Sequence, residues 1–165
     1  MAAEKIVATG ALRGLGLEVS RALAKKEDCV VLAGRNEQRG EEVRPEFVRA
    51  GWDAWLPFLD VADSKAIESF SRRVLQERGR VDVLVNNDGV LLDQPGQSAS
   101  EEARVIEKTF ATNALGPCLL CRSLVPQMVR NGFARVVNFS SGLGQFSKWQ
   151  RDIPLTDSPR PRSTP

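Results

Sequence analysis

Short apolar segments rich in β-branched residues alternate along the chain with longer segments that repeat apolar residues at helical spacing. The apolar segments cover residues 5–9, 29–33, 54–59, 81–86 and 134–140. The helically spaced segments cover residues 15–26, 38–50, 64–78 and about 101–130. Segments so short and so uniformly apolar are typical of buried strands. Their alternation with helices predicts a doubly wound α/β fold, in which a parallel sheet of about five strands binds ligands at the carboxyl ends of its strands.

Composition and the placement of proline set the limits of this domain. A chain of 165 residues with 42% hydrophobic side chains can build one core but not two. The predicted helix at 101–130 contains Pro126, which should bend it by removing a backbone hydrogen bond. Beyond Ser147 the chain becomes rich in proline and small polar residues. We therefore expect one domain at residues 1–148 and a disordered tail at residues 149–165.

Charge, hydropathy and cysteine content argue against several classes of function. Basic and acidic residues are interleaved to a net charge of +2 without a basic block, which disfavours nucleic-acid binding. No apolar run approaches the ~20 residues that cross a bilayer, and no leader precedes the first strand, so a soluble cytoplasmic protein is expected. Cys29, Cys118 and Cys121 are odd in number and histidine is absent, which favours packing roles over disulfides, a metal site or a Ser-His-Asp triad.

A glycine-rich segment, Thr9 to Gly16, follows the first predicted strand and opens the first predicted helix. Glycines at this place let the backbone approach a pyrophosphate, while the helix N-terminus supplies N–H donors and a positive dipole. Glycines also serve ordinary tight turns between a strand and a helix, so the alternative of a plain turn stays open. The segment predicts a phosphate-binding loop at Gly10, Gly14 and Gly16.

The same segment has the TGxxxGxG form of the short-chain dehydrogenase/reductase family, and four further matches follow in family order. They are Asp60-Val61 after the third strand, Asn86-Asn87-Asp88-Gly89 after the fourth, Asn113 in the last helix, and Ser140-Ser141 after the fifth strand. The chain therefore resembles this family, most closely its carbonyl reductases, up to about Ser147. The resemblance implies a Rossmann-like fold that binds a nicotinamide dinucleotide and an enzyme that acts on a small carbonyl or alcohol compound.

The resemblance also assigns roles to individual residues. It implies that Ser141 and Asn113 belong to the catalytic set. The residues that it implies contact the cofactor are Gly10, Leu12, Arg13, Gly14, Leu15, Gly16, Arg35, Asp60, Val61, Asn87 and Gly89. In this family the long helix that contains Asn113 packs against a partner subunit, so a homo-oligomer is an open alternative to a monomer.

Charge indicates which dinucleotide is preferred. Enzymes that use NAD place an acid after the second strand to bind the adenosine ribose, whereas an arginine there suits the 2′-phosphate of NADP. Here Arg35 follows the second strand, Arg13 lies in the glycine loop, and Arg39 either joins them or is a solvated helix charge. We therefore predict NADP(H) rather than NAD(H). Asp88 replaces the alanine of the family pattern and places a negative charge beside the predicted cleft, unless its side chain only caps a backbone N–H.

One part of the family's catalytic set is missing from the sequence. The family's general acid/base is a tyrosine assisted by a lysine four residues later, and this chain contains no tyrosine. The codons that can encode residues 149–165, read in a shifted frame, can specify such a tyrosine and lysine. We hypothesise that one nucleotide was lost near the Lys148 codon; the alternative is a natural terminus. The sequence thus predicts an impaired NADP-dependent oxidoreductase, with a non-catalytic dinucleotide-binding module or an inactive truncated product as the alternatives.

Overall fold

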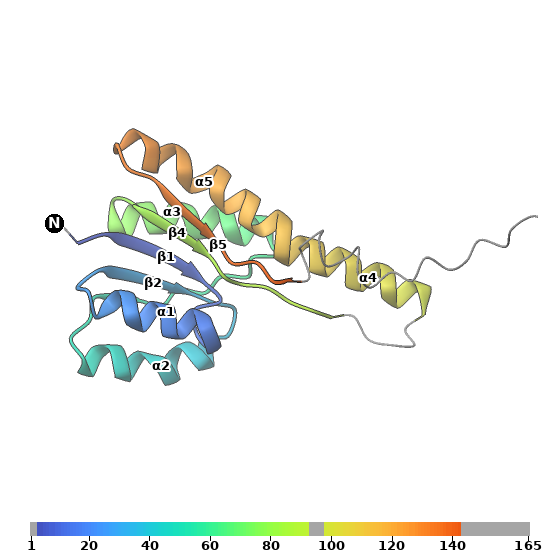
Figure 1. The fold of residues 1–165 in the computed structure, drawn as a ribbon, viewed down its shortest axis with the longest axis horizontal. Helices are drawn as coiled ribbons and strands as arrows, with labels where there is room; N and C mark the ends of the chain where they lie inside the picture. The colour runs from blue at the N-terminus through green and yellow to red at the C-terminus, as the bar shows by residue number, and fades with distance from the viewer. Residues whose placement is uncertain (1–2, 93–97, 143–165) are drawn as a thin grey trace, which may run out of the picture.

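A computed structural model describes residues 3–92 and 98–142 of the chain. Strands and helices alternate through these residues (Figure 1). The strands are β1 (Lys5–Thr9), β2 (Cys29–Ala33), β3 (Ala54–Trp55), β4 (Val83–Asn86) and β5 (Arg135–Asn138). The helices are α1 (Gly14–Ala24), α2 (Glu37–Arg49), α3 (Ser64–Arg78), α4 (Ala99–Phe110) and α5 (Gly116–Arg130), with a π-helical segment, η1 (Ala111–Leu115), between the last two. None of the helices within these residues is long and apolar enough to cross a membrane.

The five strands form one parallel sheet in the order β3-β2-β1-β4-β5. From β1 the chain adds β2 and β3 on one side of the sheet, then returns to place β4 and β5 on the other side. The direction of winding therefore reverses between β1 and β4. In open parallel sheets this reversal leaves a crevice at the carboxyl ends of the two central strands.

Helices cover both faces of the sheet, as expected for a doubly wound fold. In Figure 1, α1 and α2 lie on one side of the sheet, while α3 and α5 lie on the other. Each layer closes its own core: Leu17 and Phe47 pack on the face of α1 and α2, and Ile67, Leu120 and Met128 pack on the opposite face. The prediction of a doubly wound parallel α/β sheet of five strands is confirmed.

Local signals fix where several helices begin and end. The Asn36 side chain accepts a hydrogen bond from the Arg39 N–H (2.9 Å) at the start of α2. Asp63 accepts bonds from the Lys65 and Ala66 N–H groups (2.8 and 3.2 Å) at the start of α3. Such side chains satisfy N–H groups that have no partner within the helix. Gly79 ends α3 with a φ of 74°, a conformation that glycine adopts without steric cost.

Two predicted segments differ from the observed elements. The strand predicted at 54–59 is the two-residue β3, because Pro57 has no N–H to donate to the ladder; pairing resumes as an isolated bridge between Gly34 and Phe58. The helix predicted at 101–130 begins at Ala99 and continues through Pro126. The helical hydrogen-bond pattern changes not at that proline but at η1, where a wider π-helical turn interrupts the α-helix. Such turns are frequent at functional sites.

The fifth strand was predicted to be buried, and this prediction is wrong. All four residues of β5 are exposed, including Val136 and Val137 at 37% each. The reason lies in its neighbours, since β5 pairs only with β4 among the described residues. Within residues 3–92 and 98–142, β5 is therefore an edge strand of the sheet. The predicted tail at 149–165 lies outside these residues.

Candidate functional site

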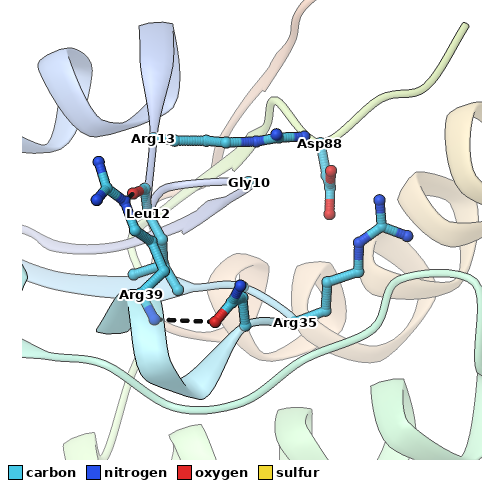
Figure 2. A pocket seen from close by; sticks show the side chains of 8 residues that line it. Gly10, Leu12, Arg13, Arg35, Arg39 and Asp88 are labelled. Carbon is cyan, nitrogen blue, oxygen red and sulfur yellow. Dashed lines mark hydrogen bonds between the residues drawn. The ribbon is translucent and has the colours of Figure 1, made fainter. Parts of the chain in front are cut away.

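A cavity of about 470 Å³ opens at the carboxyl ends of β1 and β2, close to the N-terminus of α1. Residues from three loops and from the first turn of α2 converge on it (Figure 2). The lining residues are Gly10, Leu12, Arg13, Gly34, Arg35, Asn36, Arg39 and Asp88. Four residues predicted to contact the cofactor, Gly10, Leu12, Arg13 and Arg35, are therefore brought together here.

The three loop glycines are required for different reasons. Gly10 has a φ of 60°, and a Cβ there would lie 2.9 Å from the Asp88 Cα. A Cβ at Gly16 would overlap the Gly10 carbonyl oxygen and the Asn87 side chain. Gly14, with a φ of 52°, has open space where its Cβ would lie. Protein packing explains Gly10 and Gly16, whereas the open side of the loop at Gly14 leaves room for an approaching ligand.

Thr9 and Asn87 fasten the glycine loop to the end of β4. The Thr9 hydroxyl accepts hydrogen bonds from the Asn87 and Asp88 N–H groups, both at 3.1 Å. The Asn87 side-chain amide donates to the carbonyl oxygens of Thr9 (3.0 Å) and Gly10 (3.2 Å). The Asn87 amide, predicted to contact the cofactor, therefore holds the loop in place. Thr9 was not predicted as a site residue, although its position at the end of a central strand was a usable signal.

The cavity is rich in arginine. Arg13 and Arg35 extend across it toward Asp88 (Figure 2), and neither forms an ion pair within the described ranges. Arg39 pairs with Glu42 and donates from Nε to the Leu12 carbonyl oxygen (3.3 Å), so this residue is partly neutralised although it lines the cavity. The two unpaired cations make this an electropositive wall suited to a phosphate.

Among the described residues, Asp88 is the one acid that lines the cavity. Burial raises the pKa of the Asp88 carboxyl above its ordinary value. The charges of Arg35 and Arg13 act in the opposite direction, as does a backbone hydrogen bond from Gly89, while the charge of Asp60 adds to the increase. The carboxylate is thus less stable as an anion here than in water, even with two arginines facing it.

Four predicted cofactor residues lie at the margins of the cavity. Asp60 accepts a hydrogen bond from the Ala62 N–H (3.0 Å), and Val61 is buried against Gly116 of α5. Leu15 is exposed in the first turn of α1, and Gly89 is exposed beyond Asp88. None of the four lines this cavity.

Asn113, predicted to be catalytic, lies in η1 and holds the loop that follows β4. Its side-chain oxygen accepts from the Val90 N–H and its amide nitrogen donates to the Val90 carbonyl oxygen, both at 2.8 Å. It also lines a second cavity of about 220 Å³. The other lining residues are Asn86, Asp88, Pro117, Cys118, Cys121, Asn138 and Phe139. Because Asp88 lines both cavities, they adjoin at this residue.

Ser141, the other predicted catalytic residue, is exposed just beyond the end of β5. Phe139 donates its N–H to the Asn86 carbonyl oxygen (2.9 Å), which keeps this segment alongside the end of β4. Ser141 therefore follows the wall of the second cavity. Cys118 lines that cavity as an exposed thiol rather than as the packing residue predicted. Within residues 3–92 and 98–142, no group of three potential ligands is placed to hold a metal ion.

Fold and site together define a doubly wound α/β protein whose glycine loop and arginines face one cavity. The sequence pattern of the short chain dehydrogenase family matches residues 4–151. The chain belongs to the short-chain dehydrogenase family. Proteins of this family bind NAD(H) or NADP(H).

Known proteins of this family align over most of the chain. The (+)-neomenthol dehydrogenase of Arabidopsis thaliana is 31% identical over 92% of this chain and 59% of its own length. A crystal structure of a metagenomic short-chain oxidoreductase in complex with NADP is 35% identical, with a TM-score of 0.76 over 84% of this chain and 62% of that one. A short-chain dehydrogenase from Streptomyces avermitilis is 32% identical, with a TM-score of 0.74 over 85% of this chain and 50% of that one. The chain spans about half the length of the curated relatives that it matches.

Proposed function

We propose that the chain binds NADP(H) in the arginine-lined cavity and is the cofactor-binding part of an oxidoreductase that acts on a small carbonyl or alcohol compound. The observation that carries this proposal is the meeting of Arg13, Arg35 and the N-terminus of α1 around one cavity. Arginine suits phosphate recognition, and two arginines beside the segment after β2 favour a dinucleotide that carries a 2′-phosphate.

The residues present fit this cofactor. The open face at Gly14 and the N–H groups that begin α1 would hold the pyrophosphate. Arg35 and Arg13 would hold the 2′-phosphate, because the segment after β2 supplies Arg35 and Asn36 rather than an acid for a free ribose. The relative that was crystallised with NADP supports this assignment.

The reactive end of the cofactor would lie toward the second cavity, where the predicted catalytic residues are found. Bound NADP(H) would supply or accept the hydride. Asn113 would hold the Val90 loop in place through its two hydrogen bonds, and Ser141 would orient the substrate oxygen. The chain has no tyrosine to act as the family's general acid/base, so hydride transfer by the chain alone should be slower by about 10²–10⁴-fold.

The absence of tyrosine favours a second candidate function, a dinucleotide-binding module without catalysis. The two candidates share the same cofactor site and differ only in turnover. A chain that binds NADPH but shows no oxidation of it with any small carbonyl compound would be the module.

Titration with NADPH and NADH, followed by nicotinamide fluorescence, tests the proposal. We expect tighter binding of NADPH than of NADH. Arg35→Ala should weaken NADPH binding by about tenfold or more, because it removes a charge-assisted hydrogen bond to the phosphate, and should change NADH binding little. Arg72→Ala is the control, since Arg72 lies on α3 and pairs with Glu68. Equal affinities for both dinucleotides, or equal effects of the two substitutions, would contradict the assignment.

A further inference from the structure

Asp88 lies in the wall of the cofactor cavity and faces Arg13 and Arg35, neither of which forms an ion pair within residues 3–92 and 98–142. Figure 2 shows Arg13 pointing toward it from the glycine loop and Arg35 from the segment after β2. No ion pair joins Asp88 to either arginine in the described part of the chain, so open space separates the acid from the cations. A phosphate that enters this space meets two favourable charges and one unfavourable charge.

Contacts of its backbone hold Asp88 beside the cofactor cavity. Its N–H donates to the Thr9 hydroxyl (3.1 Å), and its Cα lies so close to Gly10 that a Cβ there would be 2.9 Å away. The side chain lines the second cavity as well and therefore lies between the two cavities. The backbone of Asp88 is thus a fixed part of the wall and keeps the acid at the boundary of the cofactor cavity.

We propose that Asp88 is a specificity-determining residue that opposes the 2′-phosphate of the cofactor, so that NADP(H) binds with uptake of a proton by the Asp88 carboxylate. The proposal rests on the proposed function, since it takes NADP(H) as the ligand of this cavity. The proton comes from solvent and forms an O–H bond on the carboxylate, and no bond of the cofactor changes. The Asp88 carboxylate should weaken the binding of NAD(H) less, because NAD(H) lacks the 2′-phosphate.

The charged groups around Asp88 set the direction of the pH dependence. Arg13 and Arg35 face it across the cavity, and Asp60 acts on it from the loop after β3. Burial raises the Asp88 pKa from its ordinary 3.8 despite the two arginines. A bound phosphate would favour the neutral acid further. Affinity for NADP(H) should therefore decrease as the pH rises through the titration of Asp88.

The experiment measures NADPH and NADH binding as a function of pH for the unmodified chain, for Asp88→Asn and for Asp88→Ala. At neutral pH we expect Asp88→Asn to bind NADPH about tenfold more tightly, because the substitution removes the negative charge that opposes the phosphate, with a smaller gain for NADH. The decrease in NADPH affinity that accompanies the titration of Asp88 should be present in the unmodified chain and absent from Asp88→Asn. The 2′-phosphate also titrates, but it does so with the unmodified chain and with Asp88→Asn alike, so its contribution cancels when the two pH profiles are subtracted.

The matched control is Asp53→Asn, an acid at the amino end of the sheet that pairs with Arg78. Circular dichroism of each variant verifies that the fold is retained, and Asp88→Ala provides a second removal of the charge. Identical pH profiles for the unmodified chain and Asp88→Asn, or weaker NADPH binding by both Asp88 variants, would overturn this proposal and leave the proposed function intact. Failure of every form to bind NADPH would overturn both.

Discussion

Strands β2 and β5 belong to the same parallel sheet and are both short and rich in valine, yet their surroundings are opposite. Every residue of β2 is buried between β1 and β3 and beneath helices on both faces. Every residue of β5 is exposed, and among the described residues β5 has a neighbour only in β4. Burial in this sheet is therefore decided by neighbouring elements rather than by the composition of the strand.

The same difference separates the two cavities. The arginine-lined cavity is built on β1 and β2, and its glycine loop is held by Thr9 and Asn87 through four hydrogen bonds. The second cavity is bounded by the exposed β5 and by η1, where Asn113 is held through the Val90 loop. The arginine-lined cavity thus rests on the interior of the sheet, while the predicted catalytic residues rest on its less protected side.

A substitution at Gly16 should have the largest effect on stability. An alanine Cβ there would overlap the Gly10 carbonyl oxygen and the Asn87 amide, both of which are fixed. We expect Gly16→Ala to lower the free energy of unfolding by about 3 kcal/mol in urea titrations. Gly132→Ala, in the turn before β5, is the control. Gly132 has a φ of 80°, but a Cβ built there would meet no other described residue within 4 Å, so backbone strain alone should cost about 1 kcal/mol. Equal losses would show that the glycine loop tolerates repacking.

A matched pair of valines measures the difference between the two strands directly. Val31 of β2 is 1% exposed and Val137 of β5 is 37% exposed. Val31→Ala should lower the free energy of unfolding by about 2 kcal/mol, because it removes two buried methyl groups and leaves a cavity. Val137→Ala should cost less than about 0.5 kcal/mol. Similar losses in chemical unfolding would contradict the contrast between the strands.

Sequence reasoning identified the fold and the arginine cavity because both depend on local patterns. The alternation of strands and helices determines a doubly wound sheet, and Arg13 and Arg35 follow the strands whose carboxyl ends meet at the site. The hydrogen bonds from Asn87 to Thr9 were not predicted, since they join residues 78 positions apart. The π-helical turn at Asn113 leaves no signal in the apolar spacing, so one kinked helix was predicted around Pro126 instead.

A smaller loss than those of Gly16→Ala and Val31→Ala is expected at the link between β4 and β5. The buried Asn86 donates from Nδ2 to the Asn138 side-chain oxygen (2.8 Å), across a pair of residues in register. Asn138→Ala would leave that donor with only the Cys121 sulfur at 3.8 Å, so the free energy of unfolding should fall by about 1 kcal/mol. Asn138→Asp retains an acceptor at an exposed position and should lose less.

Amide hydrogen exchange would then locate this loss. In the sheet, β2 is separated from the Asn86–Asn138 pair by β1. Asn138→Ala should therefore accelerate amide exchange in β4 and β5 and leave that of β2 nearly unchanged. Such a result would mean that the less protected side opens without disturbing the cofactor cavity. Equal acceleration in β2 would contradict this separation, because it would show that the whole sheet opens as one cooperative unit.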